Sequence, residues 1–328
     1  MRASGTVPVT AEGPVAVGRG GRLLRALVAL ALLAGVLAVA GPRRVGVLLA
    51  GTDPRGVLLL VLVYGVVTVL RAARLSLLSR MPPGRSWTVG TAAQATVQVA
   101  PARLGELALP ALLWKEGGIP LATGAGLTLA LRALDMAALG AWVGGAVALT
   151  RGLDRPLVLA AAVLLALPLL LLPLLAAGAD RLATRLLAPR GQRGRRWTRS
   201  LRRMRRTLDG LRARPLRLGA ALVLTLLAWG GTWTSAWVIL RAMGHSWPFG
   251  QVVVGTASAT LATLVPVGVL GSFGPMETGW TAGFTALGVP VEVAAASGLA
   301  VHLWSLLITV LYGGSALLLL ELRRTRSD

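Results

Sequence analysis

Apolar stretches near twenty residues in length recur along this 328-residue chain and constrain its fold more than any other feature. About 20 consecutive apolar residues form a helix long enough to cross the hydrocarbon core of a membrane. A soluble domain carries roughly a quarter of its residues as charged side chains, whereas only 14% are charged here. The sequence therefore predicts an all-α, polytopic membrane protein. We expect about six spans, at residues 23–40, 56–70, 120–148, 157–177, 218–243 and 291–320.

The first of these spans has an alternative interpretation. Its end, Ala38-Val39-Ala40, resembles a signal-peptidase site, so residues 23–40 can also be read as a cleaved signal peptide. We expect a retained span, because the repeat described below requires it. Residues 1–22 contain scattered Gly, Pro and Arg and are expected to form a disordered cytoplasmic tail.

The net charge of +22 comes almost entirely from arginine, because Lys115 is the only lysine. Nucleic-acid binding can explain such charge, but these arginines flank the apolar spans, as cytoplasmic residues of membrane proteins do. We expect a basic cytoplasmic loop at residues 181–217, part of which can lie as a helix on anionic headgroups. Both termini are then cytoplasmic, and no nucleic-acid partner is expected. Four arginines after the second span are expected on the same side: Arg71, Arg74, Arg80 and Arg85.

Two segments are too polar and too rich in Gly and Pro to be simple spans. Residues 87–113 contain Glu106, and residues 251–287 contain Glu277. Interrupted backbone at membrane depth survives only where it is buried in protein or lines water. We expect each segment to be a re-entrant hairpin, the first entering the membrane from the cytoplasm and the second from outside.

The two halves of the chain repeat a pattern around these segments. Pro120 precedes Arg132 by twelve residues, and Pro290 precedes His302 by the same number. Each half reads span, span, hairpin, span, and this odd number of crossings makes the halves inverted relative to each other. Inverted repeats with interrupted segments are typical of secondary transporters, although chance agreement of the spacings is an alternative.

This repeat divides the chain into four parts. The first membrane repeat is expected at residues 23–150 and the second at residues 151–322. The tail described above precedes them, and residues 323–328 form a second cytoplasmic tail.

Ionisable side chains inside a membrane cost about 2.5–3.5 kcal/mol each on insertion scales, so they need partners or a water-filled cavity. Arg103 and Arg132 are candidates for holding a phosphate, because a guanidinium group binds oxyanions in a bidentate manner. The alternative for Arg103 is a pair with Glu106. For Arg132 it is a pair with Asp135, which lies three residues later on the same helix face.

The acidic side chains are candidates for balancing charge or exchanging a proton during transport. Glu106 and Glu277 occupy matching positions after Gly/Pro-rich bends. Each can instead anchor an arginine or cap the short helix that follows, where an acidic group offsets the helix dipole. Asp135 joins them as a charge-balancing residue. His302 takes the place of Arg132 in the repeat, can be neutral or charged near physiological pH, and is a third candidate for binding the lipid headgroup. The alternative is a buried structural histidine.

Patterns of soluble enzymes are missing from the sequence. There is no cysteine, and His245 and His302 are the only histidines. Neither a Walker-type phosphate loop nor an HExxH zinc motif occurs. We expect no catalytic residue, metal site or cofactor.

Two motifs resemble the membrane domain of lysylphosphatidylglycerol synthases. The first is Pro-Ala-Arg-Leu-Gly-Glu at residues 101–106, followed by a span with Arg132 and Asp135. The second is Gly274-Pro-Met-Glu277 with the later Gly-Val-Pro. It departs from the double-proline, double-glycine form of the family, and a histidine stands at position 302, where an arginine is common.

The resemblance implies a flippase-like protein of a bacterial cytoplasmic membrane. Full-length synthases add a soluble domain that transfers an aminoacyl group from tRNA to lipid. We expect no such domain here, so the resemblance implies the lipid-moving part and no enzyme activity.

Three functions follow as hypotheses. The first is binding or translocation of an anionic phospholipid or another lipid-linked substrate. The alternative is a non-transporting membrane partner of a lipid- or glycolipid-processing enzyme. A third, an intramembrane enzyme acting on lipid phosphate, requires a nucleophile or metal site that the sequence does not offer.

Overall fold

The computed structural model describes residues 34–99, 105–149, 191–264 and 273–325, together with isolated residues between 163 and 185. Regular structure in these parts of the chain is entirely α-helical, without a strand. The predicted all-α class is therefore confirmed.

Four helices are long and apolar enough to cross a membrane. They match four of the six predicted spans. The other two, at residues 23–40 and 157–177, lie largely outside the described residues. The four helices are α3 (Pro54–Ser79), α6 (Leu121–Leu149), α9 (Pro215–Ala242) and α12 (Val291–Arg324).

Local chemistry sets the ends of these helices. Asp53 precedes α3 and accepts a hydrogen bond from the Arg55 amide at 3.0 Å, which satisfies one of the free amides of the first turn. Pro54 and Pro215 occupy the first turns of α3 and α9, where a missing N–H costs nothing. The α3 helix ends nine residues later than the predicted span, and this extension decides where two arginines lie.

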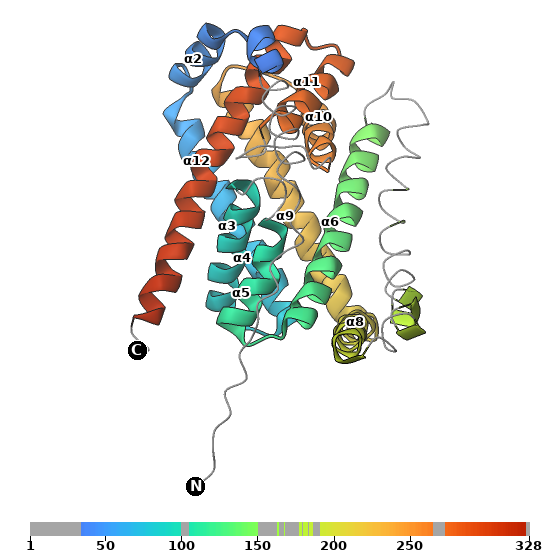
Figure 1. Ribbon diagram of the computed structural model, residues 1–328. Helices are drawn as coiled ribbons and strands as arrows, with labels where there is room; N and C mark the ends of the chain where they lie inside the picture. Colours follow the sequence, from blue (N-terminus) through green and yellow to red (C-terminus); the bar gives the residue numbers. More distant parts are fainter. Residues whose placement is uncertain are drawn as a thin grey trace.

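Two pairs of shorter helices occupy the interrupted segments. At ~1.5 Å per residue these helices are too short to cross a membrane. Figure 1 shows one pair in the lower half of the molecule and the other in the upper half. The lower pair is α4 (Pro83–Val99) and α5 (Ala108–Gly117), and the upper pair is α10 (Phe249–Ala262) and α11 (Pro275–Ala286).

Packing between the helices follows a repeated scheme. The α3 and α9 helices pack against each other at the centre. In the lower pair, α5 packs on α6 and α4 packs on α12. In the upper pair, α11 packs on α12 and α10 packs on α6. Each helix of the first half can be matched with one of the second: α3 with α9, α4 with α10, α5 with α11 and α6 with α12. When every helix is replaced by its match, the same contacts result, as expected for two equivalent halves.

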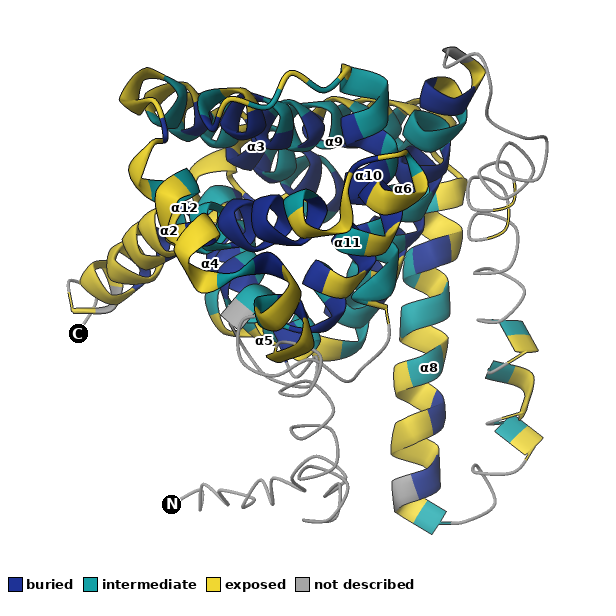
Figure 2. Ribbon diagram, turned by 90° about the horizontal axis from the view of Figure 1, so that it is seen from above, coloured by how far each residue is buried: buried dark blue, intermediate teal, exposed yellow. Residues whose placement is uncertain are grey.

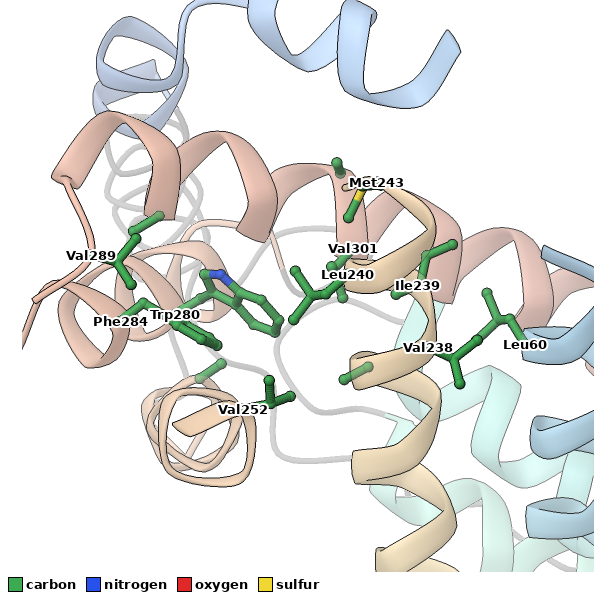
Figure 3. Packing of buried hydrophobic residues seen from close by; sticks show 14 of the residues in the cluster. Leu60, Val238, Ile239, Leu240, Met243, Val252, Trp280, Phe284, Val289 and Val301 are labelled. Carbon is green, nitrogen blue, oxygen red and sulfur yellow. The ribbon is translucent and has the colours of Figure 1, made fainter. Parts of the chain in front are cut away.

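Each helix pair has its own apolar core. Around the upper pair, Trp280 and Phe284 of α11 are fully buried against Val252 of α10 and Leu240 of α9; Figure 3 shows this cluster from close by. Around the lower pair, Leu113 of α5 packs in a second cluster of buried residues from α3, α4 and α6. Both pairs are therefore held by burial of apolar area.

The α8 helix (Gly191–Arg212) lies across the lower end of the bundle. Figure 1 shows it nearly end-on beside the start of α9, and Figure 2 shows its full length next to the bundle. It packs on α6, where Gly126 is close to the Met204 carbonyl. The expected basic loop thus contains a 22-residue helix. At the opposite end lies the short helix α2 (Pro42–Ala50).

Candidate functional site

A cavity of about 530 Å³ lies at the centre of the molecule. Its walls come from α3, α4, α6, α9, α10, α11 and α12, so both halves of the chain contribute. Ligand pockets of proteins typically enclose about 300–1,000 Å³. Its charged wall residues come from the first half: Arg71, Arg74, Glu106, Arg132 and Asp135.

Arg74 and Asp135 form the most buried ion pair of the cavity. The Arg74 Nη1 atom lies 2.6 Å from Asp135 Oδ1, and only 7% of Arg74 is exposed. Arg74 also donates to Thr225 at 3.1 Å, and the Trp229 indole N–H donates to Asp135 at 3.1 Å. Asp135 thus has three polar neighbours on α3, α6 and α9, since Arg132 Nη1 also lies 3.9 Å away.

The expected place of Arg74 was wrong. We placed it with Arg71 on the cytoplasmic side of a span ending at residue 70, but α3 continues to Ser79. Both side chains therefore lie in the cavity wall, where Arg71 donates to Thr232 on α9 at 3.2 Å. The apolar residues after position 74 were the signal for a longer helix.

Glu106 binds Arg132 rather than standing alone. Its Oε2 atom accepts from Arg132 Nη2 at 2.7 Å and from Nε at 3.1 Å. Gly105, the preceding residue, packs closely on α4, because an added Cβ would lie 2.4 Å from the Cα of Val97. The Glu106 and Arg132 side chains are 33% and 43% exposed, so this pair is accessible from the cavity. Arg103, the other predicted phosphate ligand, lies outside the described residues.

Glu277 and His302 form the matching pair of the second half. His302 Nδ1 contacts Glu277 Oε1, and neither side chain is exposed. Glu277 also accepts from the Gly274 amide at 2.8 Å, so it caps the start of α11 as the alternative interpretation expected. His302 lines the cavity, whereas Glu277 is buried behind it.

The two pairs occupy equivalent places in the chain. Glu106 and Arg132 are 26 residues apart, and Glu277 and His302 are 25 apart. Glu106 lies just before α5, and Glu277 lies in the first turn of α11. Their partners lie on the next long helix, α6 or α12. The spacing pattern predicted these residues as equivalents, and in each half the structure places the glutamate in contact with its partner on the next long helix.

Several buried polar atoms of the wall have no partner among the described residues. An unsatisfied buried polar group costs about 1–3 kcal/mol, and these atoms have almost no accessible surface, so they lie behind the cavity surface. Three of the five atoms are N–H donors, and the remaining two belong to a hydroxyl and to an imidazole. They are Arg74 Nε, Trp233 Nε1, Trp304 Nε1, Thr256 Oγ1 and His302 Nε2.

Charge in the cavity favours an anion. Three arginines and two carboxylates line it, which leaves an excess of one formal positive charge among these five side chains. Within the described residues, no three His, Asp or Glu side chains come together as a metal site requires. The tryptophans of α9 and α12 were not predicted, because their spacing matches that of ordinary core residues.

The sequence profile of the lysylphosphatidylglycerol synthase TM region matches residues 24–313. The chain belongs to this family. No curated protein and no solved structure matches it. Membership of the lysylphosphatidylglycerol synthase TM family, together with four membrane-length apolar helices, identifies a multi-pass membrane protein linked to lipid handling. The predicted resemblance is confirmed across most of the chain, and the central cavity lies within the matched residues.

Proposed function

We propose that this protein binds the headgroup of an anionic phospholipid in its central cavity and moves it between the two leaflets of a bacterial cytoplasmic membrane. The observation that carries the proposal is a cavity between both halves of the chain whose wall holds three arginines and two carboxylates. A phosphodiester has several acceptor oxygens and one negative charge, which suits such a wall.

The arrangement of the two helix pairs supports movement rather than binding alone. The lower and upper pairs lie in opposite halves of the molecule and flank the same cavity. We infer that they are re-entrant hairpins of an inverted repeat, and that rocking of one half against the other opens the cavity to each leaflet in turn.

Basic residues support one orientation of the molecule. The arginine-rich α8, the end of α12 and the start of α9 share the lower end of Figure 1. By the positive-inside rule this end faces the cytoplasm. We infer six spans with both termini cytoplasmic, so that the α4–α5 pair enters from the cytoplasm and the α10–α11 pair from outside.

Each charged residue has a role in this proposal. Arg71 and Arg132 contact the phosphate, and Arg103 joins them from the segment before Glu106. When lipid binds, the Arg132 guanidinium leaves Glu106 and contacts the lipid phosphate. When the lipid is released, Arg132 pairs with Glu106 again. Asp135 balances Arg74, while the Glu277–His302 pair accepts and releases a proton. No chemical step on the lipid is part of this function.

Loss of Arg71 is expected to weaken lipid binding and slow translocation. Arg71→Gln removes a cation of the cavity wall that donates a hydrogen bond to Thr232. A hydrogen bond to a charged group contributes about 1.5–3 kcal/mol, so we expect a loss of roughly tenfold or more. The measurement is the accessibility of fluorescent phosphatidylglycerol to a membrane-impermeant quencher in proteoliposomes. Arg85→Gln is the control, because its exposed side chain lies outside the cavity.

Neutralising Glu106 is expected to separate binding from movement. In Glu106→Gln the amide no longer competes as an anion for Arg132, so phospholipid stays bound while translocation falls about tenfold, the effect of ~1.4 kcal/mol. Lipids retained after purification are counted by mass spectrometry, and movement is measured in the same proteoliposomes. Unchanged movement in this variant would contradict the assigned role.

The same assays test the alternative function. Retained phospholipid without any translocation by the wild-type protein would overturn the transport proposal. It would favour the non-transporting partner of a lipid- or glycolipid-processing enzyme instead.

A further inference from the structure

A second hollow, of about 420 Å³, lies at the lower end of the molecule, away from the central cavity. Its walls are the end of α3, the turn between α5 and α6, the first part of α6, the end of α8 and the start of α9. No residue lines both this hollow and the central cavity. It is therefore a separate feature.

Four arginines from separate segments line this hollow. None of their side chains has a hydrogen bond or ion pair with another described residue, and no Asp or Glu lines the walls. Three of these arginines are exposed and the fourth is half-buried, so solvent screens their repulsion, and an anion between them gains charge-assisted hydrogen bonds. The four residues, hereafter the arginine pocket, are Arg80, Arg206, Arg214 and Arg217.

The backbone of Arg80 supports a role for its side chain. Arg80 follows the last residue of α3 with φ of 63°, the only positive φ at a non-glycine residue among those described. Left-handed backbone costs an L-residue about 1–2 kcal/mol, and glycine is usual just after a helix. The arginine side chain therefore stands at a position where glycine would be less strained.

Apolar side chains also line the hollow. Leu78, Ile119, Leu127 and Leu211 line it beside the arginines. The α8 helix, whose end forms part of the wall, is strongly basic, and its Trp197 is 63% exposed, as is typical of aromatic side chains at the headgroup level of a membrane. A charged wall next to an apolar wall at this level matches a lipid better than a soluble anion.

We propose that the arginine pocket binds the phosphate group of an anionic glycerophospholipid from the adjacent leaflet. The phosphate lies among the four guanidinium groups, and the lipid's glycerol and first acyl carbons lie along the leucines. Bound lipid joins α3, α8 and α9 and holds α8 against the bundle. This lipid is a structural ligand and does not enter the central cavity.

Thermal unfolding of the purified full-length chain in lipid–detergent micelles tests the proposal. Phosphatidylglycerol is expected to raise the Tm by several degrees over phosphatidylcholine, because a ligand that binds only the folded state stabilises it. The Arg214→Gln/Arg217→Gln variant is expected to lose most of this shift. Its charge-matched control is Arg196→Gln/Arg203→Gln, which removes two exposed arginines of α8 outside the pocket.

If the Arg214→Gln/Arg217→Gln variant folds poorly, Arg80→Gly provides a second test of the pocket. Glycine relieves the left-handed backbone, so the Tm in phosphatidylcholine should stay level or rise while the phosphatidylglycerol shift falls. The loss of shift caused by Arg80→Gly should be the same in an Arg71→Gln background as in the wild type, because the two sites share no lining residue, so this inference can succeed or fail apart from the transport proposal.

Two outcomes of these measurements assign or overturn the site. If the pocket and control variants lose the phosphatidylglycerol-induced rise in Tm equally, the proposal is overturned. General attraction of anionic lipid to a basic surface would then explain the rise. Inorganic phosphate could instead raise the Tm as much as phosphatidylglycerol does, with this rise again lost in Arg80→Gly. That result would support the phosphate site and assign it to a soluble phosphate.

Discussion

Replacing Asp135 by asparagine is expected to lower the free energy of unfolding by about 3–5 kcal/mol, the usual cost of leaving one charge of a buried pair without its partner. The Arg74 and Asp135 side chains are only 9% and 13% exposed, and their charged atoms lie 2.6 Å apart. In Asp135→Asn the Arg74 guanidinium keeps Thr225 as a hydrogen-bond partner but loses its counter-charge. The measurement is thermal or denaturant unfolding of the purified protein in detergent.

Two further variants separate the charge effect from a general effect of the substitution. Asp209→Asn removes a carboxylate that is 56% exposed and lies 3.5 Å from Arg205. Surface pairs contribute about 0–1 kcal/mol, so this loss should be small. The double variant Arg74→Met/Asp135→Leu should recover most of the stability, since no buried charge is left unpaired. Equal losses in Asp135→Asn and Asp209→Asn would contradict the importance of the buried pair.

Enlarging Gly279 is expected to separate α10 from α11. Gly279 and Gly283 lie one turn apart on α11, facing α10. A Cβ added at Gly279 would lie 2.7 Å from the Ser258 carbonyl oxygen and 2.4 Å from the Ala262 Cβ. Small residues at such spacing let membrane helices approach closely. Overpacking costs about 1–3 kcal/mol and more where backbone blocks the way, so we expect about 3 kcal/mol for Gly279→Val.

Gly219→Val is the matched control for this change. A Cβ at Gly219 on α9 meets no atom within 4 Å. Both variants replace a helical glycine by valine, so their difference reports the contact between α10 and α11. Because α10 and α11 line one side of the central cavity, Gly279→Val should also reduce lipid translocation. Similar stability in the two variants would show that α11 can shift at little cost.

The sequence predicted the elements of this fold better than their ends. Hydropathy located α3, α6, α9 and α12, and Gly/Pro-rich composition located both interrupted segments, because these properties act over neighbouring residues. The end of α3 was placed too early because a run of arginines was taken as the end of a span. Arg71 and Arg74 remain in the helix since both have polar partners on α9.

The candidate site was predicted in part. Spacing within each half paired Arg132 with His302 and Glu106 with Glu277 as equivalent residues, and each glutamate contacts the partner from its own half. Arg74 was missed as a site residue, although it is the main partner of Asp135. The tryptophan donors of the cavity wall were missed as well, because nothing in a local pattern distinguishes them from core residues.

By itself, the sequence determined that this chain is a helical membrane protein with charged residues inside its apolar segments, and it predicted two similar halves. Hydropathy and proline positions act locally and can be read residue by residue. Only the tertiary structure decided which charges meet, since Arg74 and Asp135 are 61 residues apart and Arg71 and Thr232 are 161 apart. Such pairs depend on how α3, α6 and α9 pack, and packing is a property of the whole bundle.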